Sequence, residues 1–177
     1  MIDGDDGRND RPPYSYVPGG PWPHPIGDPA GHSTGSRPGP ALPVAGDAWG
    51  ESPAYLRGVD LFNDGYYWEA HEEWEALWHA HGRRGPVADV VKALIKLAAA
   101  GVKVREGQPH GVATHAGRAA DLLDAVRAGH GPRRLGIDLG DLASRAREVA
   151  GRPPTAAAGK DATVAVVFAF RIEPGQA

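Results

Sequence analysis

Four breaks rich in Gly and Pro divide the middle of the chain into segments of helical length. The breaks lie at residues 63–65, 82–86, 107–109 and 129–132. Between them, apolar residues recur every three or four positions, which predicts amphipathic helices rather than strands. Short links join antiparallel neighbours in helical bundles. Residues 51–151 are therefore predicted to form an all-α domain, an antiparallel bundle of four to five helices.

Local start and stop signals place the helix ends. Ser52 followed by Pro53 is a standard start, because Ser caps free N–H groups and Pro fits the first turn. Asp138 starts the last helix in the same way. A run of small residues at 98–101 would let a neighbouring helix approach closely. The predicted helices span residues 53–63, 66–81, 87–105, 110–128 and 139–149.

Both ends of the chain differ from this helical pattern. Residues 1–50 contain ten Gly and ten Pro residues, which predicts an irregular Pro/Gly-rich arm, an extended or disordered leader. Three aromatic residues, Tyr14, Tyr16 and Trp22, could instead pin this arm to the helices. Residues 152–177 are predicted to form a C-terminal extended tail. Its Val/Phe-rich part favours a strand but has no partner strand, so it lies against the helices or is poorly ordered.

Composition excludes several classes of protein. At 177 residues, the chain has the length of one domain with a real core. A net charge of −3 argues against a general nucleic-acid binder. The absence of Cys excludes disulfides, cysteine zinc sites and thiol catalysis. With no secretory signal and no membrane-spanning run, we expect a cytoplasmic protein without a membrane partner.

Residues 62–78 are predicted to be the functional centre of the sequence. It holds three of the five Trp residues and the densest group of acids and His in the chain. On a helix, His71 and Glu75 project from the same face, because residues four apart are neighbours. A His and a carboxylate among aromatic rings are either costly to bury or part of a site.

Divalent metal binding is the first hypothesis for this cluster. His71 and Glu75 supply two ligands, and either Glu72 or His115 is a candidate third ligand. This donor set suits zinc, manganese or iron. The chain lacks the His-Glu-x-x-His of zinc proteases and the Glu-x-x-His of ferritin-like sites. The residues expected to support the site are Asn63, Tyr67, Trp74 and Trp78.

Three other hypotheses remain open at this point. In a structural network, His71 bonds Glu75 or Asn63, and the Trp78 indole bonds a carboxylate, with no chemistry involved. The second alternative is metal-free acid/base catalysis, so the sequence leaves open whether the protein is an enzyme. The third is an interaction module that binds a partner or an anionic ligand through an exposed basic set: Arg83, Arg84, Lys92 and Lys96.

The remaining charged residues of this region have simpler interpretations. Glu69 and Glu73 are predicted to be solvated, as are the loop residues His24 and His32. At the end of the same helix, His79 and His81 favour its negative pole rather than bind a ligand. Ala-rich helix faces would also suit a homodimer.

The pattern Phe-Asn-x-Gly-x-Tyr-x-Glu-x-His-Glu-x-x-Glu-x-x-Trp at residues 62–78 resembles a bacterial and archaeal family, the domain of unknown function DUF309. The resemblance covers residues 55–126, and the family's His-x-x-x-Glu-x-x-Trp signature corresponds to His71, Glu75 and Trp78. It implies a small helical protein. The signature has been proposed to bind metal, which implies that His71 and Glu75 are ligands.

Overall fold

The computed structural model describes residues 11–36, 40–155 and 158–175. A 3-10 turn, η2 (Trp49–Glu51), precedes the first α-helix, and two short strands, β1 (Arg133–Arg134) and β2 (Ile137–Asp138), lie between the last two. The five α-helices of the described ranges are α1 (Pro53–Asn63), α2 (Tyr67–Ala80), α3 (Pro86–Glu106), α4 (Pro109–His130) and α5 (Leu139–Gly151). The predicted all-α class is confirmed.

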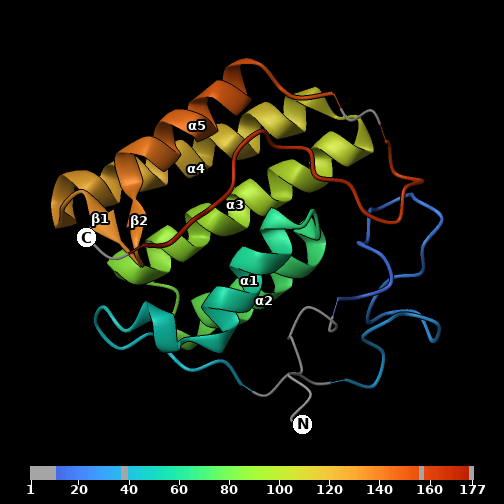
Figure 1. Ribbon diagram of the computed structural model, residues 1–177, viewed down its shortest axis with the longest axis horizontal. Helices are drawn as coiled ribbons and strands as arrows, with labels where there is room; N and C mark the ends of the chain where they lie inside the picture. Colours follow the sequence, from blue (N-terminus) through green and yellow to red (C-terminus); the bar gives the residue numbers. More distant parts are fainter. Residues whose placement is uncertain (1–10, 37–39, 156–157, 176–177) are drawn as a thin grey trace, which may run out of the picture.

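Each helix packs against the next along the chain, so α1, α2, α3, α4 and α5 form a consecutive series. Figure 1 shows α3 in the middle of the bundle, with α1 and α2 on one side and α4 and α5 on the other. Because α3 has neighbours on both sides, most of its residues are buried. One stripe of α3, with Lys92, Lys96 and Lys103, stays half-exposed.

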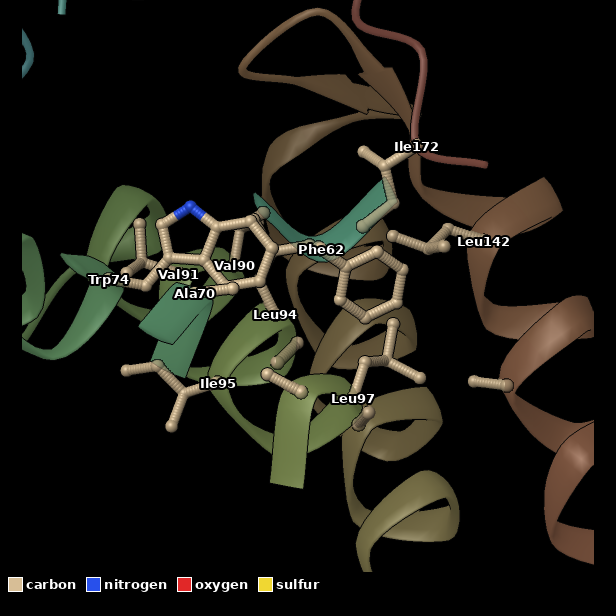
Figure 2. Packing of buried hydrophobic residues seen from close by; sticks show 14 of the residues in the cluster. Phe62, Ala70, Trp74, Val90, Val91, Leu94, Ile95, Leu97, Leu142 and Ile172 are labelled. Carbon is tan, nitrogen blue, oxygen red and sulfur yellow. The ribbon is translucent and has the colours of Figure 1, made fainter. Parts of the chain in front are cut away.

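The aromatic centre of the core lies where α1, α2 and the C-terminal segment meet. The Phe62 ring lies 5.8 Å from the Trp74 ring and 5.5 Å from the Phe168 ring. Figure 2 shows the Phe62 ring between Ile172 and Leu97, with the Trp74 indole beside it. Residues far apart in the sequence therefore share one buried cluster.

Two glycines let the helices of this core approach closely. A Cβ atom on Gly58 of α1 would lie 2.2 Å from Trp74 Nε1. A Cβ atom on Gly101 of α3 would lie 2.5 Å from Cγ of the Tyr67 ring. The close approach predicted for the small residues at 98–101 is thus found at Gly101, against α2.

The helix ends follow the predicted signals. The Ser52 side chain accepts a hydrogen bond from the Tyr55 N–H, and Pro53 occupies the first turn of α1. The Asp138 side chain accepts one from the Asp141 N–H at the start of α5. Gly107 ends α3 in the left-handed conformation, with φ +71°, which glycine adopts without strain.

A two-residue turn between β1 and β2 was not predicted. Leu135 and Gly136 both have positive φ, 54° and 71°, which fits the turn type that closes tight hairpins. Leu135 is buried despite its unusual backbone conformation. The Tyr55 hydroxyl donates a hydrogen bond of 2.7 Å to the Leu135 carbonyl, which ties the hairpin to α1.

The described part of the N-terminal arm is packed against the helices rather than free in solvent. Tyr14 and Val17 are buried, and Ser15 is 1% exposed. The Tyr14 ring stacks on Trp22 with centroids 5.4 Å apart, and the Trp22 indole donates to the Ala162 carbonyl. The predicted leader therefore takes the pinned form over residues 11–36, while residues 1–10 and 37–39 lie outside the described ranges.

The C-terminal tail runs along the bundle without forming a strand in the described residues (Figure 1). The Asn63 carboxamide accepts from the Ile172 N–H and donates to its carbonyl, both at 2.8 Å, as a neighbouring strand would. Phe168 and Ile172 are buried in the core. The tail is thus an extended segment held by side chains of the helices.

None of the described helices is long and apolar enough to cross a membrane.

Candidate metal centre

Helix α2 positions the candidate ligands. Gly65, with φ +88°, turns the chain after α1, and the helix begins at Tyr67. The buried side of α2 is formed by Tyr67, Ala70, Trp74 and Leu77. Because these side chains fix the rotation of the helix, His71, Glu72 and Glu75 are left half-buried at its border with solvent.

His71, Glu72 and Glu75 form one compact group. One ligand atom from each residue can be chosen so that all three lie within 4.8 Å of one another. The predicted pair His71 and Glu75 is thus brought together, and Glu72 is the third member. Within the described part of the chain, no other group of three His, Cys, Asp or Glu residues meets this condition.

The spacing within the group fits metal ligation better than hydrogen bonding. His71 Nδ1 lies 3.4 Å from Glu72 Oε1, yet it is buried and makes no hydrogen bond with a described residue. Two ligands held about 2.1 Å from one ion at a tetrahedral angle are themselves about 3.4 Å apart. Glu75 forms no ion pair or hydrogen bond with any described residue. The donor set is therefore free to take a cation.

His115, the alternative third ligand, lies on α4 and is outside this compact group. Burial lowers the pKa of His115, and so do the nearby charges of Lys96, Lys103, Arg118 and His71. The His115 Nδ1 atom is buried without a hydrogen-bond partner among the described residues. His115 thus lies outside the compact group but within electrostatic reach of His71.

Two tryptophans flank the group along α2. The Trp68 ring is nearly parallel to the His71 imidazole, with centroids 6.3 Å apart. Lys92 and Arg83 lie over the Trp78 ring, 5.6 and 5.8 Å from its centroid. The indole N–H groups of both tryptophans are buried, and neither finds a hydrogen-bond partner within residues 11–36, 40–155 or 158–175. The proposed bond from Trp78 to a carboxylate is therefore not formed there.

The other residues expected to support the site serve the core and the tail. The Asn63 carboxamide is engaged by Ile172, so the suggested bond from His71 to Asn63 is wrong. The Tyr67 hydroxyl accepts from the Val167 N–H at 2.9 Å, and the Trp74 indole donates to the Tyr55 carbonyl at 3.3 Å. None of these three residues makes a hydrogen bond to a candidate ligand within the described ranges.

Glu69 corrects a prediction, because it is not solvated but 7% exposed. Its carboxylate accepts from Ser15 Oγ and the Tyr16 N–H, both at 2.9 Å, and lies 3.2 Å from His32 Nε2. His32 was also predicted to be solvated, yet its side chain is 6% exposed. The N-terminal arm covers both residues, and no local sequence signal pointed to this contact, since the partners are 37–54 positions apart.

The remaining predictions for this region have mixed outcomes. Glu73 is half-buried rather than solvated, and its carboxylate pairs with Arg57 at 3.1 Å. Burial raises the pKa of Glu73, and Arg57 opposes that shift.

Two histidines, one at the end of α2 and one in the arm, also differ from free solvated side chains. Nε2 of His81 accepts from the Val44 N–H at 3.0 Å, and burial lowers the pKa of this imidazole. His24 is half-buried rather than solvated, with its ring 5.6 Å from Trp68. Thus the arm reaches Trp68, which itself stacks on His71.

Comparison with known proteins agrees with the resemblance seen in the sequence. The family model described as "Domain of unknown function (DUF309)" matches residues 55–114, which include His71, Glu72 and Glu75. No curated protein and no solved structure matches the chain.

Proposed function

We propose from the site itself that this protein binds a divalent metal ion. The DUF309 family model that matches residues 55–114 is described without an activity. The ligands are His71, Glu72 and Glu75. The observation that carries the proposal is the convergence of one nitrogen and two carboxylates within 4.8 Å on α2.

The chemistry of the group supports this function. Two carboxylates offset the charge of a dication, and a mixed nitrogen and oxygen donor set suits zinc, manganese or iron. The Trp68 ring lies nearly parallel to the His71 imidazole, with centroids 6.3 Å apart. When bound, such an ion supplies a Lewis acid that lowers the pKa of a coordinated water. His115 is a second imidazole within electrostatic reach of His71, and an imidazole is the side chain best suited to take up or release a proton near neutral pH.

The alternative, a non-catalytic structural or interaction module, needs the His/Glu cluster to be a satisfied hydrogen-bond network. The geometry gives that network little support. His71 Nδ1, His115 Nδ1 and Trp78 Nε1 are all buried without a hydrogen-bond partner among the described residues. Buried polar atoms left unsatisfied cost roughly 1–3 kcal/mol each, so their concentration beside one group favours a site over a scaffold.

Metal stoichiometry tests the proposal. Chelator-treated protein is dialysed against Zn²⁺ or Mn²⁺ and analysed for metal, as wild type, His71→Ala, Glu75→Gln and His79→Ala. His79 is the matched control, because it is an exposed histidine on the same helix. We expect about one ion per chain in wild type and in His79→Ala, with affinity at least tenfold weaker in the other two.

A second readout keeps the experiment decisive. A ligand that binds the folded state raises the melting temperature, so metal should stabilise wild type and His79→Ala but not His71→Ala. If no protein binds metal, and His71→Ala melts well below wild type without it, the imidazole is a structural residue and the proposal fails.

A further inference from the structure

Helix α3 presents a stripe of lysines on the same side of the bundle as the candidate metal centre. Lys92, Lys96 and Lys103 are separated by four and seven positions, which places them on one face of a helix. All three are half-buried, whereas the residues beside them on α3 are mostly buried. The stripe runs between α2 and α4, the two helices that carry His71 and His115.

Helix α4 borders this stripe closely. A Cβ atom on Gly111 would lie 3.0 Å from Lys103 Cδ and 3.1 Å from its Cγ, so the lysine stem lies along α4. His115 follows one turn further along α4, and Arg118, three positions later, lies on the same side of that helix. Burial lowers the pKa of His115, and the charges of Lys96, Lys103 and Arg118 lower it further. Three helices thus bring their polar groups to one face.

The positive charges on this face are only partly compensated. Lys103 pairs with Glu106 at 2.7 Å, and Lys92 lies over the Trp78 ring. By contrast, neither Lys96 nor Arg118 forms an ion pair with any residue that the structure describes. The formal charge of the whole chain is −3, so this local excess of cations runs against the overall balance.

We propose that Lys96 and Arg118 bind a phosphate-bearing anion at this face, with His115 as a further hydrogen-bonding group. Cations from two helices suit a group with several charged oxygens, and arginine forms paired hydrogen bonds to phosphate. Binding of the anion requires only these cations and does not depend on the metal. That the anion is the substrate rests on the proposed function, in which His71, Glu72 and Glu75 hold a metal ion on α2, the helix that packs against α3.

This proposal names the chemical class that the metal centre would act on. A divalent ion and nearby cations together neutralise the charge of a phosphate group, which is the general requirement for phosphoryl chemistry. The recognised group is the phosphate, whether free or as an ester of a larger molecule.

Calorimetric titration of the full chain with inorganic phosphate and with phenyl phosphate tests the site. The variants are Lys96→Gln and Arg118→Gln, and Arg152→Gln is the matched control, an exposed arginine at the end of α5. We expect saturable binding of at least one probe in wild type. Each site variant should weaken it about tenfold, and the control should stay within about twofold.

Two results would overturn the anion site: no saturable binding of either probe, or an equal loss in Arg152→Gln. Arg118 is exposed, so its replacement leaves the fold intact and keeps the test valid if Lys96→Gln proves unstable. Metal content, measured on the same samples, separates the two proposals. Phosphate binding that depends on Lys96 in a protein that takes up no metal would overturn the metal centre alone.

Discussion

Glu69 shows how strongly a single side chain can depend on distant parts of the chain. It lies on α2 away from the apolar stripe, where a carboxylate would ordinarily face water. Instead, Ser15, Tyr16 and His32 of the arm surround it with hydrogen-bond donors. Arg105, which is 2% exposed, donates to the Ser15 and Gly159 carbonyls and joins the arm to the C-terminal segment.

Replacing Glu69 with Gln should release the arm. The amide would direct its own N–H groups at donors, so we expect a loss of roughly 2–4 kcal/mol in unfolding free energy. Hydrogen exchange at the Tyr16 amide, which donates to Glu69, should become faster. Glu73→Gln is the control, since its part-exposed ion pair with Arg57 is worth under about 1 kcal/mol. An arm that stays equally protected in Glu69→Gln would contradict this role.

His81 provides a prediction for pH. Burial lowers the pKa of His81, and Nε2 must stay unprotonated to accept from the Val44 N–H. The unfolded chain therefore takes up a proton more readily, near the ordinary histidine pKa of about 6.5. The contribution of His81 to the unfolding free energy is therefore fully present above the pKa of the unfolded state. It is lost as the pH falls from that value toward the lower pKa of the folded state.

Melting temperatures of wild type and His81→Gln between pH 8 and pH 5 test the sign. Wild type should lose stability on acidification more steeply than the variant does. The comparison cancels the contributions of the other histidines. Parallel curves for the two proteins would show that His81 does not sense pH.

At the level of elements, the helices were predictable because their ends are encoded locally. Ser52 with Pro53, Gly107, and Asp138 each act within one turn of their own position. The hairpin at residues 133–138 was not predictable in this way. Leu135 is a poor residue for positive φ, and its conformation is supported by Tyr55, which is 80 positions away.

The contact between α2 and α3 gives a prediction about packing. Gly101→Ala would place a methyl group 2.5 Å from a Tyr67 ring atom, so we expect a loss of about 1–3 kcal/mol in unfolding free energy. Gly117 on α4 has open space at the same position, and Gly117→Ala should be neutral or stabilising by up to about 1 kcal/mol. Denaturant unfolding measures both. Equal effects would show that the two helices can move apart at little cost.

At the level of the whole molecule, the candidate metal group was predictable and its surroundings were not. His71, Glu72 and Glu75 are within four positions on one helix, so helical spacing brings them together. His115, Lys96 and Arg118 come near the metal group only because α3 packs between α2 and α4. The arm and tail are joined by contacts such as Ser15 to Thr163, which no local pattern encodes.

Metal binding at α2 is tested most directly by an anomalous-difference map from crystals soaked in Mn²⁺. We expect a peak about 2.0–2.3 Å from a His71 nitrogen and from oxygens of Glu72 and Glu75. The peak should vanish in crystals of His71→Ala that diffract equally well. Wild-type crystals with no peak at this position, or with peaks at other carboxylates alone, would contradict the claim that α2 carries a metal centre.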